Sequence, residues 1–525
     1  MSTYLWRLLG LCLIVGWWAS PVWAGAVGGT IESLGAGDKT VVIKVGKDER
    51  QETVTLEAAA TITLDGKPAS AKDLVPGRYG VFFTDDANRA SRVSLRSTAP
   101  STAAPTKPAE PKTTTKSPMP LKNAPSSTAA RGKAPAAGEW PQIRGPNRDG
   151  ISTETGLLKT WPSDGPKLVW EAQGLGEGYS SVSVANGLVL TMGNQGDAEG
   201  VIAVDFKTGK QVWGTPTGRA FRESRGDGPR AVPTIDGNAA YALGGNGDLV
   251  CLDLASGKIR WQVNILQSTS GNNIKWGISE SVLVDGDRVI CTPGAAQATM
   301  IALNKQTGKL IWSCGAASVR SPGYASAVVA TIGGVRQYVQ FTGDGLIGVK
   351  ADDGTFLWQD NSAGNGTANC SAALVQGNFV FYASGYGTGC ALLEIGQAGG
   401  RFAARQVYQN KSLINHHGGM VLIDGYVYGC DERSLVCLDA KTGQVAWQDR
   451  CVGKGSVIAA DGMLYVRSEA GPMALVEVNP KAYVEKGRFD PPKGNRNTWP
   501  YPVVAGGRLL LRDQEKLLCY DVKAQ

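Results

Sequence analysis

The chain has 525 residues, of which 42% are hydrophobic and 19% charged, and a formal net charge of +7. Residues 98–138 carry six cations against Glu110 alone, and Arg7 lies in an N-terminal leader, so a net charge of only about +1 remains for the rest. A nearly neutral body lacks the electrostatic footprint of a DNA- or RNA-binding protein, and no nucleic-acid partner is expected.

Residues 1–24 have the three parts of a secretory signal peptide. Arg7 supplies the positive charge, Leu8 to Ser20 form the apolar run, and Val22-Trp23-Ala24 resembles a cleavage site. The apolar run is too short for a permanent membrane helix, and no longer one follows. We expect a periplasmic or secreted protein that keeps no transmembrane segment after cleavage.

Two further regions precede the main body of the chain. Residues 25–97 contain short β-branched and aromatic runs such as Thr40–Lys44 and Tyr79–Phe83, which predict a small β-barrel or sandwich. Residues 98–138 contain eight prolines among Thr, Ser, Ala and Lys, a composition typical of a disordered linker.

From residue 139 to the C-terminus one phrase recurs: an acidic residue or Asn, then Thr-Gly or Ser-Gly, then Trp. Its copies are Asp205-Thr208-Gly209-Trp213, Asp253-Ser256-Gly257-Trp261, Asn304-Thr307-Gly308-Trp312, the degenerate Lys350-Asp353-Gly354-Trp358 and Asp439-Thr442-Gly443-Trp447. Trp213, Trp261, Trp312 and Trp358 are 46 to 51 residues apart. This period, with several short strands per copy, is typical of β-propeller blades.

Eight apolar first strands follow in sequence, and they predict an all-β, eight-bladed propeller over residues 139–525. They begin near Ser181, Ala231, Ser281, Ala325, Ser371, Gly418, Ser456 and Tyr501. The last unit has only three strands, and Lys167–Trp170 can supply its fourth, which would close the ring without a free edge. We expect the turn glycines to adopt positive φ and the Trp rings to pack between adjacent blades.

The cysteines fit a role as small buried residues. Cys251, Cys437 and Cys519 stand two residues before the acidic position, where other copies have alanine or glycine. No Cys-x-x-Cys pair is present, so neither thiol redox chemistry nor a zinc knuckle is expected. Two pairs within one blade remain open as disulfides: Cys370 with Cys390, and Cys430 with Cys437.

The loops that lead into the first strands converge on one mouth of the predicted channel, and they are polar. They contain Glu177, Tyr179, Arg225, Asp227, Arg230, Lys275, Trp276, Glu280, Tyr324, Asn369, His416, His417, Lys454, Trp499 and Tyr501. Such a set is typical of a pocket for a polar ligand, and equally of loops whose charges pair with one another in water. Both interpretations stay open.

His416 and His417 are the only histidines. Adjacent side chains on an extended segment point in opposite directions, so the two rings are not expected to bind one metal ion. We expect one ring to be hydrogen-bonded in the channel and the other to pack between blades, with no metal site.

The repeat phrase resembles that of pyrroloquinoline-quinone-type, or quinoprotein-like, propellers. The segments Trp140–Gly150, Gly176–Ser181 and Asn415–Gly419 are also similar to exported bacterial proteins of that class. The superfamily includes quinone-dependent alcohol and sugar dehydrogenases, and the non-enzymatic propeller of the outer-membrane β-barrel assembly machinery. The resemblance covers residues 139–525 and implies the fold more firmly than any activity.

The dehydrogenases of this class hold calcium through oxygen ligands, and many have two adjacent cysteines, which this chain lacks. Glu177, Asp227, Glu280 and Asn369 are possible oxygen ligands, but no motif unites them. The resemblance favours a monomeric, non-catalytic binding or assembly scaffold of the cell envelope, without cofactor, whose partner is an envelope protein or a polar small molecule or glycan. The alternatives are a periplasmic alcohol or sugar dehydrogenase using pyrroloquinoline quinone (PQQ) and calcium, and a carbohydrate or wall-polymer binding protein.

Overall fold

The computed structural model describes residues 25–35, 40–45, 50–64, 67–76, 78–84, 89–96, 136 and 138–524. The predicted signal peptide and nearly all of the predicted linker lie outside these residues. The chain divides into two compact units, Met1–Ser117 and Pro118–Gln525. Within the described ranges, no helix has the length and apolarity needed to cross a membrane.

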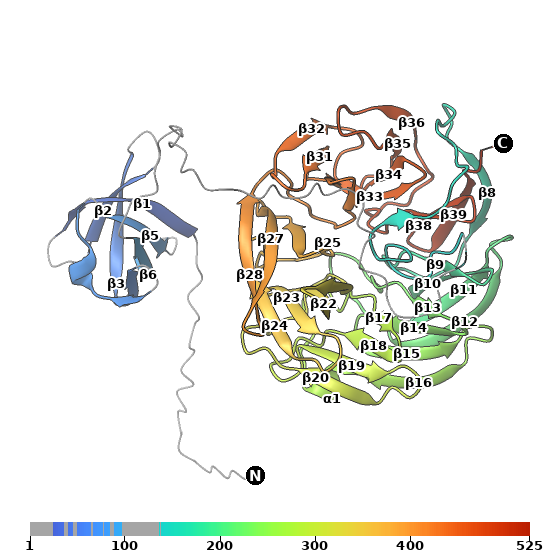
Figure 1. The fold of residues 1–525 in the computed structure, drawn as a ribbon, viewed down its shortest axis with the longest axis horizontal. Coiled ribbons are helices and arrows are strands. Elements are labelled where there is room, and N and C mark those ends of the chain that lie inside the picture. Colours follow the sequence, from blue (N-terminus) through green and yellow to red (C-terminus); the bar gives the residue numbers. More distant parts are fainter. Residues whose placement is uncertain are drawn as a thin grey trace, which may run out of the picture. The chain divides into compact units, whose positions relative to one another are not determined.

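The first unit is a small β-barrel (Figure 1). Its strands are β1 (Gly25–Leu34), β2 (Thr40–Val45), β3 (Arg50–Leu64), β4 (Lys67–Ala69), β5 (Tyr79–Thr84) and β6 (Arg89–Arg96), with a 3-10 turn at Ala71–Asp73. They follow the order β2-β1-β5-β6-β3-β4, and β2 also pairs with β3, which closes the sheet on itself. Alternate residues such as Val41, Ile43 and Val93 fill its interior.

The second unit is a propeller, whose sheets are arranged in a ring (Figure 1). The described residues of this unit form eight sheets, seven with four strands and one with five. The first sheet contains β9 (Ser183–Ala185), β10 (Leu188–Gln195), β11 (Ala198–Asp205) and β12 (Gln211–Arg219), and the second contains β13 (Thr234–Asp236), β14 (Ala239–Leu243), β15 (Asp248–Asp253) and β16 (Ile259–Asn264). The third sheet contains β17 (Leu283–Asp285), β18 (Arg288–Cys291), β19 (Met300–Asn304) and β20 (Leu310–Cys314). The fourth contains β21 (Val328–Ile332), β22 (Val335–Thr342), β23 (Gly345–Lys350) and β24 (Phe356–Asp360).

The other four sheets continue around the ring. The fifth sheet contains β25 (Leu374–Gln376), β26 (Phe379–Ser384), β27 (Gly389–Ala398) and β28 (Arg401–Asn410), and the sixth contains β29 (Val421–Ile423), β30 (Tyr426–Cys430), β31 (Leu435–Asp439) and β32 (Val445–Asp449). The seventh sheet contains β33 (Gly455–Ala460), β34 (Met463–Ser468), β35 (Met473–Glu477) and β36 (Glu485–Phe489), together with the short strand β7 (Ile151–Ser152). The eighth contains β37 (Val503–Ala505), β38 (Arg508–Asp513) and β39 (Lys516–Asp521), together with β8 (Lys167–Ala172). One short helix, α1 (Ile265–Thr269), follows β16. Each of the eight first strands expected from the sequence begins one of these sheets.

The repeat phrase forms a turn and a hydrogen-bonded contact between neighbouring sheets. Asp205 accepts hydrogen bonds from the backbone N–H of Thr208 (2.8 Å) and from its hydroxyl (2.7 Å), which shapes the turn. Gly209 then adopts a φ of 69°. The indole of Trp213 reaches the following sheet and donates from Nε1 to the carbonyl of Leu254 at 3.0 Å. The positive φ and the packing of Trp between blades, both predicted from the sequence, are confirmed.

Three further pairs of neighbouring sheets are joined by the same hydrogen bond, whereas Trp312, which faces the degenerate copy, makes none. The donors Trp170, Trp261 and Tyr408 reach Phe206, Lys305 and Ala440, which directly follow the acidic position or its Asn counterpart. Trp358 precedes a sheet that lacks the phrase, and its Nε1 donates to the Gln337 side chain of its own sheet at 2.7 Å. Trp447 also precedes a sheet without the phrase, but its Nε1 donates to the Asn479 carbonyl of that sheet at 2.7 Å.

The ring is closed by the two ends of the propeller sequence. Strand β8 pairs antiparallel with β39, as the sequence predicted, and Trp170 lies opposite Cys519. The nine cysteines that the structure describes are free, and eight of them are buried, including Cys251, Cys437 and Cys519. Neither of the two pairs left open by the sequence is bonded.

Candidate functional site

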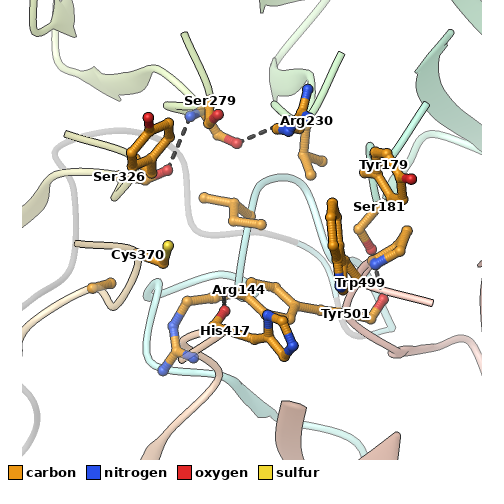
Figure 2. Close-up of a pocket in the computed structure, with 16 residues that line it drawn as sticks. Arg144, Tyr179, Ser181, Arg230, Ser279, Ser326, Cys370, His417, Trp499 and Tyr501 are labelled. Atoms are coloured by element: carbon orange, nitrogen blue, oxygen red, sulfur yellow. Dashed lines mark hydrogen bonds between the residues drawn. The ribbon is translucent and has the colours of Figure 1, made fainter. Parts of the chain in front are cut away.

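A cavity of about 150 Å³ lies on the axis of the propeller (Figure 2). Its lining residues are Ile143, Arg144, Tyr179, Ser181, Arg230, Val232, Ser279, Ser281, Tyr324, Ser326, Cys370, Ala372, His417, Trp499, Pro500 and Tyr501. Apart from Ile143 and Arg144, they come from the segments that precede the first strands of seven sheets.

The lining follows a simple rule of spacing. In six sheets, the residues four and two positions before the first strand both line the cavity, for example Tyr179 and Ser181 before β9, and Trp499 and Tyr501 before β37. Side chains alternate along extended backbone, so every second residue of each lead-in points to the axis. The residues two positions before the first strand are small, except Tyr501, and their small side chains leave space in the channel.

The segment Trp140–Gly150 contributes Ile143 and Arg144 to the lining. The Arg144 guanidinium donates to the carbonyl of Asp149 at 2.8 Å and to that of Met420. Arg148 lies next to it and donates to the carbonyls of Ser281 (3.1 Å) and Ala327 (2.8 Å), in two other sheets. Burial lowers the pKa of both guanidinium groups, and the carbonyl dipoles compensate their charge.

Aromatic rings cover much of the cavity wall. The Trp499 ring lies 4.4 Å from that of Tyr179 and 6.1 Å from that of His417, centroid to centroid. Tyr324 lies 5.5 Å from Trp276. The Tyr501 hydroxyl donates to the His417 carbonyl at 2.7 Å, which fixes this ring in the wall.

One carboxylate, Glu469, holds three of the surrounding side chains. It accepts from Nε2 of His417 at 2.7 Å and from Nε1 of Trp499 at 3.3 Å, and Nζ of Lys454 lies 3.5 Å away. Burial raises the pKa of Glu469, but these donors and the Lys454 charge outweigh it and lower the pKa to about 2. Burial also lowers the pKa of His417, so at neutral pH a neutral imidazole donates to a carboxylate.

Arg230 is the second charged residue of the lining. Its guanidinium lies 3.2 Å from the Glu223 carboxylate, and its central carbon is 5.4 Å from the centre of the Tyr179 ring. Burial lowers its pKa, although the Glu223 charge opposes this. Arg230 therefore gives the wall positive character without an isolated charge.

Only some of the residues predicted for the mouth line the cavity. Tyr179, Arg230, Tyr324, His417, Trp499 and Tyr501 do so. Trp276, His416 and Lys454 contact lining residues or their partners. Glu177, Arg225 and Lys275 are exposed, and Asp227 pairs with Arg222 at 3.2 Å.

Glu280 and Asn369 lie one residue away from the lining positions and point away from the cavity. Glu280 accepts from the backbone N–H (2.7 Å) and hydroxyl (3.1 Å) of Thr292, and burial raises its pKa to about 7. Asn369 donates to the Thr342 carbonyl at 2.9 Å. Both stabilise the loops rather than face the channel.

The prediction that the two histidine rings point in opposite directions is wrong. Their centroids are 5.0 Å apart, because residues 416 and 417 lie in a bend and not on an extended strand. His416 packs against Tyr386 at 4.3 Å, and burial together with Lys454 lowers its pKa to about 4.

Comparison with known proteins identifies the family of this propeller. The family model described as outer membrane protein assembly factor BamB matches residues 150–277 and 198–449. The chain belongs to this family. It is 23% identical over 255 residues to the outer membrane protein assembly factor BamB of Yersinia pestis, an alignment that covers 47% of this chain and 58% of that protein. The chain thus spans just over half the length of this BamB relative.

Solved structures share the fold of this BamB-family chain. The quinohemoprotein alcohol dehydrogenase of Comamonas testosteroni aligns with a TM-score of 0.53 and 12% identity, over 75% of this chain and 82% of that one. The quinohemoprotein alcohol dehydrogenase ADHIIG of Pseudomonas putida HK5 aligns with a TM-score of 0.50 and 12% identity, over 74% and 81%. At this identity the likeness shows the quinoprotein-like propeller fold alone.

The cavity of this BamB-family member does not fit a calcium-bound quinone. Calcium takes six to eight oxygen ligands, usually including carboxylates, and no carboxylate is among the residues that line the cavity. No group of three or more His, Cys, Asp or Glu side chains able to hold a metal ion occurs in the described ranges. Of the four oxygen donors considered from the sequence, two are buried in loops, one is exposed and one is paired with Arg222.

Several residues of the site were not predicted. Ser181, Ser279, Ser281, Ser326 and Cys370 line the cavity, and Glu469 organises its wall. The two-residue spacing before each first strand would have found the serines and the cysteine. Glu469 follows β34, outside the lead-in loops, and the sequence offers no repeated signal for it.

Proposed function

We propose that this protein is a non-catalytic scaffold of the cell envelope that binds protein partners during outer-membrane protein assembly. Membership of the BamB family over residues 150–449 carries the proposal. The absence of carboxylates among the residues that line the axial cavity supports it, because a quinone held by calcium requires several oxygen ligands around that ion. A periplasmic location follows from the predicted signal peptide.

A scaffold needs an apolar surface for its partner, and the outer strands of three consecutive sheets offer one. Val212 on β12, Ile259 on β16 and Leu310 on β20 are 50%, 44% and 59% exposed, and we call them the apolar rim. Ile259 and Leu310 lie two residues before the Trp of their repeats, and Val212 lies one residue before it; all three are on the outermost strands of their sheets. Exposed aliphatic side chains of this kind contribute the contact area of protein–protein interfaces.

The proposal is tested in the bacterium that encodes the chain. Deletion of the gene is expected to lower the amounts of outer-membrane β-barrel proteins, measured by quantitative mass spectrometry of the outer membrane. The wild-type chain should restore them, and the triple variant Val212→Ser, Ile259→Ser, Leu310→Ser should restore less than half. The matched control, Val407→Ser with Val445→Ser on β28 and β32, should restore them fully.

A second arm uses the purified protein with PQQ and calcium, and measures dye reduction with alcohols and sugars. No reduction is expected. Unchanged barrel proteins after deletion, or substrate-dependent reduction, would contradict the scaffold; full restoration by the triple variant would contradict the apolar rim only.

A further inference from the structure

The axial cavity has a consistent chemical character. Its wall presents aromatic faces from Tyr179 and Trp499 and from Tyr324, and its charged lining residues, Arg144 and Arg230, are both cations. Lys454 lies one side chain behind this wall, beyond Glu469. Glu223 pairs with Arg230 and Glu469 with Lys454, but neither carboxylate lines the cavity. A ligand with apolar ring faces and negative charge is therefore favoured over a cationic one.

The hydroxyl groups of the cavity can donate. The Ser281 hydroxyl oxygen accepts the backbone N–H of Val232 at 2.8 Å, and that of Ser326 accepts the N–H of Ser281 at 2.9 Å. Each oxygen thus has a donor, and its own hydrogen is left to point to an acceptor in the cavity. Ser281 and Ser326 stand at the same position, two residues before the first strands of neighbouring sheets, so the two donors lie side by side in the wall.

The aromatic wall continues beyond the cavity. From Trp499 the rings of His417, His416 and Tyr386 follow one another at 6.1, 5.0 and 4.3 Å. Tyr386 is 43% exposed and has a φ of 57°, a conformation that a bulky residue rarely adopts. Residues held in such backbone conformations cluster at active sites and ligand-binding sites.

We propose that the axial cavity binds the end of a saccharide chain that carries carboxylate groups, and that the row from Trp499 to Tyr386 supports the following sugar units. Sugar rings present C–H faces to Trp and Tyr, while the carboxylate meets the cations and hydroxyl donors. Saccharide binding goes beyond the scaffold function and does not depend on it. Calorimetry with the purified protein tests saccharide binding, whereas the amounts of outer-membrane proteins test the scaffold.

The test measures binding of glucuronate oligomers and of glucose oligomers of equal length by isothermal titration calorimetry. The acidic hexamer is expected to bind at least about tenfold more tightly than the neutral one. Trp499→Ala and Lys454→Gln should each weaken it, and Lys441→Gln, an exposed lysine on the turn of the neighbouring β31–β32 hairpin, should not.

Tyr386→Gly separates binding from folding. Glycine relieves the left-handed backbone, so the variant should melt at the same or a higher temperature. It should bind the acidic hexamer about tenfold more weakly and the dimer unchanged, because only the longer chain reaches this ring.

Equal binding of acidic and neutral oligomers, no binding of either, or equal losses in Lys454→Gln and Lys441→Gln would each overturn the proposal. So would tighter binding of PQQ, a flat aromatic acid, than of the acidic hexamer in a competition experiment.

Discussion

At the scale of single residues, Glu280 couples protonation to folding. Its side chain is buried, and burial raises its pKa from 4.5 to about 7, although Arg148 opposes the shift. Below pH 4.5 the carboxyl is protonated in both the folded and the unfolded chain. Between pH 4.5 and 7 only the unfolded chain loses the proton, so the free energy of unfolding falls as pH rises, by about 3 kcal/mol in total.

The variant Glu280→Gln removes this titration. From pH 5 to pH 8 the free energy of unfolding, measured with urea, should fall by up to about 3 kcal/mol less in the variant than in the wild type. Burial also raises the pKa of Glu199, to about 8, so a slope remains in the single variant and shrinks further in Glu199→Gln with Glu280→Gln. The exposed Glu432→Gln is the control, and parallel curves for Glu280→Gln and wild type would contradict the argument.

The residues of the site could be predicted from the sequence only in part. The loops were located correctly, but the choice within them followed polarity, which selected Glu280 and Asn369. In the structure, alternate residues of each loop face the axis, so Ser279, Ser281 and Cys370 line the cavity. Polarity does not show which side of an extended segment faces the axis, because a buried carboxyl with local donors is as polar as one that faces a ligand.

At the scale of elements, the repeat phrase acts through a close contact between a glycine and a ring. A Cβ at Gly209 would lie 2.6 Å from Cε3 of Trp170, and Gly257 and Gly308 face Trp213 and Trp261 in the same way. The glycine is thus required twice, for its φ and for the ring of the preceding sheet. The fold of the blades could be predicted well from the sequence, because this contact between glycine and ring depends on a short segment that recurs along the chain.

Two alanine variants in one blade separate these requirements. Gly187 has a φ of 75°, and a Cβ added there would meet no atom within 4 Å, whereas Gly209 has a φ of 69° and the Trp170 contact. Both variants should lose about 1 kcal/mol for the left-handed backbone. Gly209→Ala should lose about 1–3 kcal/mol more, because the Trp170 ring must move.

Urea unfolding of both variants and the wild type measures the difference. Equal losses for Gly187→Ala and Gly209→Ala would show that the ring contact between the blades contributes nothing to stability.

At the scale of the whole molecule, the ring depends on a strand from the beginning of the propeller sequence. Strand β8 completes the sheet of β37, β38 and β39. Even the glycine contact is kept there, since a Cβ at Gly165, two residues before β8, would lie 2.4 Å from the Phe489 ring of the preceding sheet. The sequence predicted this closure, because a unit with three strands needs a fourth.

Deletion of residues 1–173 removes β8 and exposes the edge of β39. We expect the product to aggregate or to lose its cooperative thermal transition, because the bare edge no longer has its hydrogen-bonding partner. Deletion of residues 1–135 keeps β8 and the segment Trp140–Gly150, and its propeller transition should equal that of the full chain. Differential scanning calorimetry compares the two products.

The longer deletion also removes Arg144 and Arg148, so a point variant isolates the strand. Trp170→Ser leaves the backbone of β8 in place, but removes the ring under Gly209 and the hydrogen bond to Phe206. It should melt cooperatively, at a lower temperature than the 1–135 deletion product. If the 1–173 deletion melted like the full chain, β8 would not close the ring in solution. If Trp170→Ser melted like the full chain, closure would rest on the backbone pairing of β8 and β39 alone.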